Sequence, residues 1–451
     1  MEGDQLKIGC FLSVLVFLFW ASPLVVAGAG YMNVTASEAE AMIESAPLIV
    51  VLDVRTRNEY DSGHIRNAKL VPLAELEGRL GELDEADEIL VYCLSGGRSG
   101  MASQILADNG FLHVFNLLGG ITAWISEGFP TYVKYSSIQD AVRNADEGSA
   151  VYVSQATYFE NVVVNKTVSI AGEAMESTHI VGNILIEANY VRFQEFSVEG
   201  DMLGSGITLL HSNSSTITGN QVKSKHWAGI TVKEHSHNNT ISNNIILGNE
   251  CGITIGYFEG PPAGNDNIIA DNLIANNTMG VEVYTNSTGN RIVRNTLENN
   301  SDGGILVLNG DAANNTIYHN NMIHNGEAGY GNAEDLAANT WNNGCEGNYW
   351  SNYNGTDTSI PADGIGDTYL PAEELDHYPL VSPYWNHADI NHDLKADIKD
   401  VATAAVAFGS SPSHPKWNPH TDITGPKHLE PDGKVDIRDI ALMAVEYGET
   451  Y

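Results

Sequence analysis

The run Ile89-Leu90-Val91-Tyr92-Cys93-Leu94-Ser95-Gly96-Gly97-Arg98-Ser99 joins an apolar segment to a glycine-rich loop, with a thiol at the junction. The apolar residues before Cys93 predict a buried parallel strand, and Gly100 to Asn109 suit a helix. Gly96 and Gly97 let the loop curl so that backbone N–H groups converge on the sulfur. Helix onset at Ser99 and the charge of Arg98 also favour a thiolate. The sequence therefore predicts a nucleophilic Cys93.

The segment around this loop, residues 31–133, carries further pieces of one family pattern. They are Asp53-Val54-Arg55 with Glu59-Tyr60, Gly63-His64-Ile65, and Leu118-Gly119-Gly120-Ile121 with Trp124 and Pro130. As a set with the Cys93 loop, they resemble the single-domain rhodaneses. The resemblance implies an α/β domain in which Cys93 takes sulfane sulfur from a donor such as thiosulfate and passes it to a thiophilic acceptor.

The same resemblance assigns roles within the loop. Cys93 and Arg98 would be catalytic, and the persulfide would be cradled by Leu94, Ser95, Gly96, Gly97 and Ser99. Four residues separate Cys93 from Arg98, whereas related phosphatase loops have five, so the shorter loop favours a sulfur atom over a tetrahedral oxyanion. We expect an internal Asp53–Arg55 ion pair and a packing role for His64. The alternative is a structural cysteine in an inactive, binding-only domain.

Residues 134–385 contain a repeat. Ile217, Ile241, Ile268, Ile292 and Ile317 recur at steps of 24, 27, 24 and 25 residues, each followed three positions later by Asn220, Asn244, Asp271, Asn295 or Asn320. A second mark recurs as Gly229-Ile230, Gly252-Ile253, Gly280-Val281 and Gly304-Ile305. Short Val/Ile strands between Asn and Gly corners at this period predict a parallel β-solenoid. We expect the asparagines to be structural, with amides bonded from coil to coil.

This solenoid resembles the right-handed parallel β-helix of the NosD and pectin-lyase-like superfamily. Gly347-Asn348-Tyr349-Trp350-Ser351, Asp363-Gly364-Ile365-Gly366-Asp367 and Tyr378-Pro379-Leu380 resemble its terminal segment. The family name suggests copper, but no His/Met/Cys ligand cluster repeats, so we do not expect copper. Polysaccharide binding or cleavage along the coil face is an alternative. Trp227, Tyr257 and Tyr284 would then be either stacking platforms or aromatic caps on coil edges.

Residues 386–451 hold a duplicated, oxygen-rich loop. The first copy offers Asp389, Asn391, Asp393, the carbonyl of Lys395, Asp397 and Asp400 at the spacing of a calcium loop. The second copy, displaced at its head, offers Asp422, Asp432, Asp436 and Asp439. A helix follows each copy, so a small all-α calcium-binding unit is expected.

Two such loop–helix units resemble a type I dockerin. The resemblance implies a cohesin-bearing partner, with the recognition positions falling on Ile398, Lys399, Ile437 and Arg438. The alternative is an acidic surface cluster without metal. We expect calcium as the cofactor and no organic cofactor.

The chain as a whole is strongly acidic. Its 451 residues carry a formal charge of −35, so no basic face is available for nucleic acid. Lys7, the apolar run from Ile8 to Val26 and Ala27-Gly28-Ala29 predict a signal peptide over residues 1–29, with an uncleaved anchor as the alternative. The protein is therefore expected to be secreted or held at the cell surface, outside the cytoplasm.

Cysteine spacing argues against a disulfide framework. Cys251 and Cys345 lie about four coils apart in the repeat, which is about 19 Å at the spacing of stacked strands. A disulfide requires Cα atoms within about 7 Å. These two cysteines are not expected to pair.

The organisation predicted from sequence is a signal peptide (1–29), a rhodanese domain (31–133), a β-helix (134–385) and a dockerin (386–451). The leading function is an exported sulfurtransferase tethered through its calcium-dependent dockerin. A second reading makes the β-helix a carbohydrate-binding or polysaccharide-degrading subunit of a cohesin–dockerin assembly, with an ancillary rhodanese domain. A third treats the chain as a non-enzymatic surface adhesion protein in which Cys93 is unused.

Overall fold

The computed structural model describes residues 30–45, 49–201, 204–224, 227–256, 264–327, 329–359 and 364–384. The predicted signal peptide and the predicted dockerin, with all of its calcium and partner residues, lie outside this range, as does Tyr257. Within the described range no helix is both long enough and apolar enough to cross a membrane.

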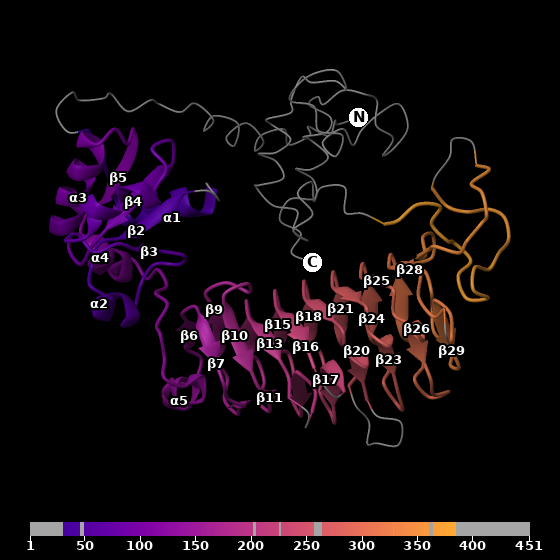
Figure 1. The fold of residues 1–451 in the computed structure, drawn as a ribbon. Helices are drawn as coiled ribbons and strands as arrows, with labels where there is room; N and C mark the ends of the chain where they lie inside the picture. Colours follow the sequence, from indigo (N-terminus) through magenta and orange to yellow (C-terminus); the bar gives the residue numbers. More distant parts are fainter. Residues whose placement is uncertain are drawn as a thin grey trace, which may run out of the picture.

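The described part of the chain begins with an α/β domain built on a five-stranded parallel sheet (Figure 1). In spatial order the strands are β1 (Met32–Val34), β5 (His113–Leu117), β4 (Glu88–Tyr92), β2 (Val50–Asp53) and β3 (Lys69–Leu70). The helices are α1 (Ala36–Ser45), α2 (Arg57–Asp61), the 3₁₀ helix η1 (Leu76–Glu82), α3 (Gly97–Asp108) and α4 (Gly120–Ser126).

Successive side chains of β4 point to opposite faces of the sheet, and each face packs against helices. Leu90 and Tyr92 point into one apolar cluster with residues of α1 and α4, such as Ala39 and Trp124. Ile89, Val91 and Cys93 point into the other cluster, which contains Leu76 of η1 and Leu106 of α3. A central parallel strand buried on both faces is apolar throughout, as the sequence of β4 is. Cys93 therefore lies at the end of the strand, at the foot of α3.

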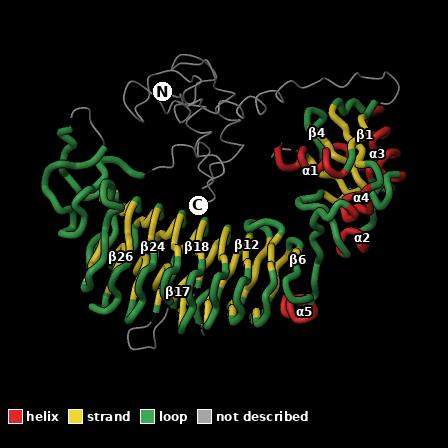
Figure 2. The backbone as a smooth tube through the Cα atoms, turned by 180° about the vertical axis from the view of Figure 1, so that it is seen from behind, coloured by secondary structure: helices red, strands yellow, loops and turns green. Residues whose placement is uncertain are grey.

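A parallel β-solenoid follows, introduced by the short helix α5 (Ile138–Asn144), whose N-cap is Ser137. Figure 2 shows its strands stacked coil upon coil into a rod. In the described residues the strands form three parallel sheets. The β6 sheet runs β6 (Ala150–Val153), β9 (Ser169–Gly172), β12 (Arg192–Gln194), β15 (Thr216–Thr218), β18 (Thr240–Ser242), β21 (Ile268–Ala270), β24 (Arg291–Val293) and β27 (Thr316–Tyr318).

The other two sheets complete each coil. The β7 sheet runs β7 (Ala156–Tyr158), β10 (Thr178–Val181), β13 (Ser197–Glu199), β16 (Gln221–Lys223), β19 (Ile245–Leu247), β22 (Leu273–Ala275), β25 (Thr296–Glu298), β28 (Asn321–Ile323) and β30 (Tyr349–Trp350). The β8 sheet runs β8 (Val162–Val164), β11 (Ile184–Ile186), β14 (Ile207–Leu210), β17 (Ala228–Lys233), β20 (Cys251–Ile255), β23 (Met279–Val283), β26 (Gly303–Val307) and β29 (Ala333–Asp335).

The predicted structural role of the asparagines is confirmed. Asn220, Asn244, Asn272, Asn295, Asn320 and Asn348 form a buried ladder in which each Nδ2 donates to the next Oδ1 at 2.9–3.1 Å. Similar ladders start at Asn239 and at Asn249. Other asparagines, such as Asn243 and Asn299, take the left-handed conformation at corners. Asparagine therefore has two structural roles in the solenoid, in the buried amide ladders and at the left-handed corners.

In one coil, the register predicted from the repeat is displaced by one residue from the observed register. The strand register pairs Ile241 with Ile269, and the buried ladder continues through Asn272, so Ile268 and Asp271 are not the equivalent positions. Asp271 instead occupies a corner with φ of 57° and accepts two hydrogen bonds from Arg294, each 2.8 Å long. A carboxylate cannot take the inward position because a ladder residue must also donate.

The connection between the two domains is hydrogen-bonded on both sides. Tyr132 exchanges backbone hydrogen bonds with His64 of the α/β domain, at 2.8 and 3.1 Å. The next residue, Val133, donates to Tyr152 O at 3.0 Å and accepts from Ser154 N at 2.9 Å in the first coil. The linker therefore ties the α/β domain directly to the first coil of the solenoid.

Candidate functional site

The Cys93 loop is shaped by glycines on two segments. Gly96 has φ of 96°, a conformation that favours glycine, and it precedes the first turn of α3. Across from it, Ile121 N donates to Cys93 O at 2.8 Å, and Thr122 donates to Leu94 O from both its N–H and its hydroxyl. A side chain at Gly120 would collide with the Cys93 carbonyl. The glycine pair of the closing motif thus allows α4 to hold the loop.

The sulfur of Cys93 lies among hydrogen-bond donors. The residue is 1% exposed, Gly96 N donates to its Sγ at 3.2 Å, and the buried Ser99 hydroxyl lies 3.5 Å from it. Burial raises the pKa of the Cys93 thiol, but the Ser99 hydroxyl and the N–H groups of Ser99, Ser95 and Gly96 outweigh it, and the pKa falls below its ordinary value. These donors can therefore stabilise a Cys93 thiolate.

Arg98 forms an ion pair that the sequence prediction did not include. Its Nη1 and Nη2 form a two-point ion pair with the Glu59 carboxylate at 2.9 and 2.6 Å. Glu59 raises the pKa of Arg98 most, and the charge of Cys93 adds a smaller contribution. Arg98 is therefore partly neutralised by Glu59, and the groups named above contribute more than Arg98 to lowering the thiol pKa.

Glu59 is a site residue whose role the sequence reasoning missed. The Arg98 hydrogen bonds are the main cause that lowers the pKa of Glu59 to about 2. Thr56 and Glu59 also form a capping box at the start of α2, so this carboxylate is held from two sides. The Thr-x-x-Glu spacing was the available signal, although spacing alone does not place its carboxylate beside Arg98.

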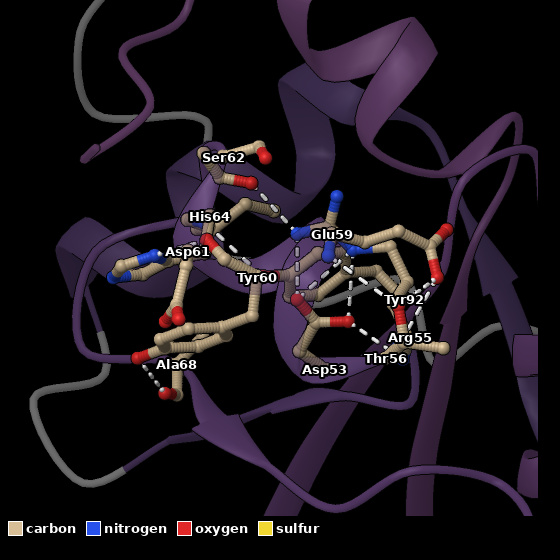
Figure 3. A network of polar contacts seen from close by, with 12 residues as sticks. Asp53, Arg55, Thr56, Glu59, Tyr60, Asp61, Ser62, His64, Ala68 and Tyr92 are labelled. Atoms are coloured by element: carbon tan, nitrogen blue, oxygen red, sulfur yellow. Dashed lines mark hydrogen bonds and ion pairs between the residues drawn. The ribbon is translucent and has the colours of Figure 1, made fainter. Parts of the chain in front are cut away.

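Behind the loop, Asp53 and Arg55 form the expected internal ion pair. Arg55 Nη2 lies 2.7 Å from Asp53 Oδ2, both side chains are buried, and the same nitrogen donates to Gly63 O at 2.7 Å. Figure 3 shows this pair beside Tyr92, the residue immediately before the nucleophile. The pair links the end of β2 to the segment after α2 and so has a structural role.

The remaining predicted loop residues divide between its rim and its interior. Leu94 is 49% exposed, and Ser95 and Gly97 are also exposed, whereas Ser99 is buried. Leu94 therefore lies at the rim, where an incoming molecule would pass. The backbone N–H groups of Ser95, Gly96 and Ser99 face the Cys93 sulfur together with the Ser99 hydroxyl.

The other described cysteines lie outside this site. Cys93, Cys251 and Cys345 are all free, so the prediction that Cys251 and Cys345 do not pair is confirmed. Cys251 is buried on β20, where its thiol donates to the Glu282 carboxylate, and burial followed by that charge raises the thiol pKa. Tyr284, considered as a stacking platform, is 8% exposed and donates to the same carboxylate at 2.8 Å, so it packs against the coil.

Known families match both domains. The model of the rhodanese-like domain matches residues 35–127. The model described as periplasmic copper-binding protein (NosD) matches residues 135–355. These matches agree with the α/β domain and with the parallel solenoid that follows it.

Among individual relatives, the YrkF protein of Bacillus subtilis is 40% identical over 82 residues, which are 18% of this chain and 44% of YrkF. The sulfurtransferase of Allochromatium vinosum is 35% identical over 82 residues, 18% of this chain and 77% of the relative. The thiosulfate sulfurtransferase GlpE of Coxiella burnetii is 33% identical over 94 residues, 21% of this chain and 87% of GlpE.

The rhodanese-like model covers the α/β domain and its Cys93 loop, and the second family model covers the solenoid. This chain spans less than half of YrkF but most of GlpE and of the Allochromatium protein. The chain belongs to the rhodanese-like family, and its N-terminal α/β domain is a rhodanese-like sulfurtransferase domain followed by a NosD-like parallel β-solenoid.

Proposed function

We propose that this protein carries sulfane sulfur as a persulfide on Cys93. The observation that carries the proposal is the Cys93 sulfur, which is buried, faces the Gly96 N–H and the Ser99 hydroxyl, and has a lowered thiol pKa. A thiolate is the nucleophilic form of cysteine. Relatives named as thiosulfate sulfurtransferases support the same chemistry.

The first half-reaction forms the persulfide. The Cys93 thiolate attacks the outer sulfur of a donor such as thiosulfate, a new S–S bond forms, and the donor's own S–S bond breaks. Sulfite leaves with the electron pair of that bond. No external oxidant or reductant is consumed, because the sulfane sulfur keeps its oxidation level as it moves.

The second half-reaction releases the sulfur. A thiophilic acceptor such as cyanide attacks the outer persulfide sulfur, and the S–S bond to Cys93 breaks. Its electron pair returns to Cys93 as a thiolate, which the same donors stabilise. The loop thus raises the fraction of Cys93 that is present as thiolate for attack, and it stabilises the same thiolate as the leaving group.

A single-turnover mass measurement tests this proposal. The full chain is incubated with thiosulfate, desalted and digested, and we expect the mass of one added sulfur atom on the peptide that contains Cys93. Cyanide should then remove that sulfur. The peptides that contain Cys251 and Cys345 are internal controls, and equal labelling of all three cysteines, or none on Cys93, contradicts the proposal.

We further propose that the protein works outside the cytoplasm and is tethered through residues 386–451 by calcium and a cohesin-bearing partner. The predicted signal peptide, the duplicated Asp/Asn loops and the match to a family described as periplasmic support this arrangement. Chelation of calcium should abolish binding to an immobilised cohesin and leave sulfur transfer unchanged. Binding that persists in excess chelator contradicts the calcium-dependent tether.

A further inference from the structure

Glu173 belongs to the solenoid, yet its carboxylate is buried in the seam with the sulfurtransferase domain. It follows β9 and is 0% exposed. Oε1 accepts from Asn67 N at 2.7 Å, and Oε2 accepts from Gln155 N at 2.9 Å. His64 Nε2 lies 3.1 and 3.0 Å from the two oxygens, and the Glu173 carbonyl accepts from Arg66 Nε at 2.8 Å. A residue of one domain thus binds three residues of the other.

Both ring nitrogens of His64 face hydrogen-bond acceptors. Nδ1 lies 2.9 Å from the carbonyl oxygen of Tyr60, which can only accept, so Nδ1 carries a proton. Burial raises the pKa of Glu173, but the hydrogen bond and charge of His64, with the N–H groups of Gln155 and Asn67, lower it below its usual range. Nε2 of His64 therefore faces a carboxylate whose oxygens already accept two backbone N–H groups, an arrangement that suits a proton on Nε2. His64 and Glu173 form a buried histidine–carboxylate pair, with the Tyr60 ring stacked on His64 at 3.7 Å.

A buried ion pair of this kind needs a reason beyond stability. Both side chains are almost fully buried, at 0% and 1% exposure, and burying two charges is often no better than packing apolar residues in their place. What such a pair does provide is a fixed geometry, because each partner has directional hydrogen bonds on every side. The segment that this pair fixes is residues 63–67.

This segment contacts Arg55 and the residue that precedes the nucleophile. Arg55, paired with Asp53, donates to Gly63 O at 2.7 Å, and Ile65 N donates to the Tyr92 hydroxyl at 3.2 Å. Tyr92 is 0% exposed and precedes Cys93 in the chain. Figure 3 shows His64 and Tyr60 on one side of the Asp53–Arg55 pair, with Glu59 and Thr56 on the other. The segment is therefore held by Glu173 from outside and by Arg55 and Tyr92 from within.

We propose that Glu173 of the solenoid is a positioning residue of the sulfur-transfer site, acting through His64 and residues 63–67 on Tyr92 and the Cys93 loop. This inference rests on the proposed persulfide chemistry of Cys93. It assigns the solenoid a part in catalysis, since the solenoid provides the carboxylate that holds the back of the active site.

The test uses the full chain with Glu173→Gln, which keeps the size of the side chain and removes its charge. We expect alkylation of Cys93 by iodoacetamide at pH 7, followed by peptide mass analysis, to slow about three- to tenfold, with kcat/KM for sulfur transfer falling in parallel. With ¹⁵N-labelled histidine, both ring nitrogens of His64 should be protonated in the wild type. Only Nδ1 should remain protonated in the variant, and a His64→Gln spectrum assigns the signals.

Glu195→Gln is the matched control. Glu195 is also a solenoid carboxylate and lies 3.4 Å from Arg66 of the sulfurtransferase domain, but this pair is at the partly exposed rim of the seam. Its removal should leave Cys93 alkylation within about twofold of wild type. If Glu173→Gln does not fold, Glu173→Asp retains the charge but retracts it by one methylene, and a slowing of about twofold or more is expected.

The outcomes are distinct. A folded Glu173→Gln variant with unchanged alkylation overturns the proposal, because Glu173 would then only join the domains. A control that slows as much as Glu173→Gln overturns it as well, and so does a singly protonated His64 ring in the wild type. A wild-type chain that transfers no sulfur, but whose Cys93 alkylation falls in Glu173→Gln, refutes the proposed function and leaves the positioning role intact.

Discussion

Two cysteines of this chain are equally buried and chemically opposite. Cys93 in the sulfurtransferase domain and Cys251 in the solenoid are each 1% exposed. The pKa of the Cys93 thiol is lowered, and that of the Cys251 thiol is raised. Burial raises both, but around Cys93 the neighbouring hydrogen-bond donors outweigh it, whereas around Cys251 the Glu282 carboxylate adds to it.

The neighbours of the two sulfurs differ in what they can do in a hydrogen bond. Cys93 faces backbone N–H groups and the Ser99 hydroxyl, all of which can donate to a negative sulfur. Cys251 faces the Glu282 carboxylate, which can accept the thiol proton and repels a thiolate. A buried cysteine is therefore reactive or inert according to whether donors or acceptors surround it.

The largest expected difference between the two cysteines is in catalysis. Cys93→Ala should lower the rate of sulfur transfer from thiosulfate to cyanide by at least about a thousandfold, because the nucleophile is removed. Cys251→Ser should leave that rate within about twofold of wild type. A steady-state assay of thiocyanate formation measures both. Comparable losses in the two variants would contradict the assignment of Cys93.

The alkylation rates of Cys93 and Cys251 should differ by about a hundredfold or more at pH 7, because the pKa of the Cys93 thiol is lowered and that of the Cys251 thiol is raised. The measurement is the rate of iodoacetamide labelling, followed on the separate Cys93 and Cys251 peptides after digestion. Cys345, which is exposed, gives the reference rate of an accessible thiol in the same chain. Similar rates for Cys93 and Cys251 would show that burial alone governs both.

Ser99→Ala should sharpen the comparison by making Cys93 more like Cys251. Loss of the hydroxyl removes a donor to the thiolate, so the pKa of Cys93 should rise by about one unit and kcat/KM near neutral pH should fall about tenfold. The pH dependence of the alkylation rate should therefore shift to higher pH, with the rate at high pH preserved. An unshifted profile would mean that the N–H groups alone hold the thiolate.

Glu282→Gln changes the surroundings of Cys251 instead of those of Cys93, and we expect it to have the smallest effect. Removal of the carboxylate charge should lower the pKa of Cys251, yet burial, the larger cause of its elevation, remains. We expect Cys251 labelling to increase by about threefold or less at pH 8 and sulfur transfer to be unchanged. A labelling rate that reaches that of Cys93 would show that the carboxylate, and not burial, keeps this thiol inert.

Much of the fold and of the Cys93 site could be predicted from the sequence because these features depend on residues close together in the chain or on a regular repeat. The Cys93 loop with its glycines, the internal Asp53–Arg55 pair and the repeat of the solenoid follow from short spacings. The asparagine ladders follow from the period, since an inward amide in one coil meets an amide in the next. The strand that ends just before Cys93 follows from a continuous apolar run.

The features that sequence reasoning missed depend on three-dimensional contacts. The irregular coil places Ile269 and Asn272, not Ile268 and Asp271, in register, because only an amide can both donate and accept in the ladder. Arg98 forms an ion pair with Glu59, which lies 39 residues away in the sequence. His64 meets Glu173 across 109 residues and a domain boundary, so the expectation of a packing role did not include this pairing.

The pH dependence of Cys93 alkylation in the full-length wild-type chain tests the central claim most directly. Donors around a buried sulfur predict an inflection clearly below about 8.5, the ordinary thiol pKa, with the rate rising through it as the thiolate forms. An inflection at or above that value, with Cys251 and Cys345 resolved on their own peptides, would contradict the claim that this loop holds an ionised sulfur.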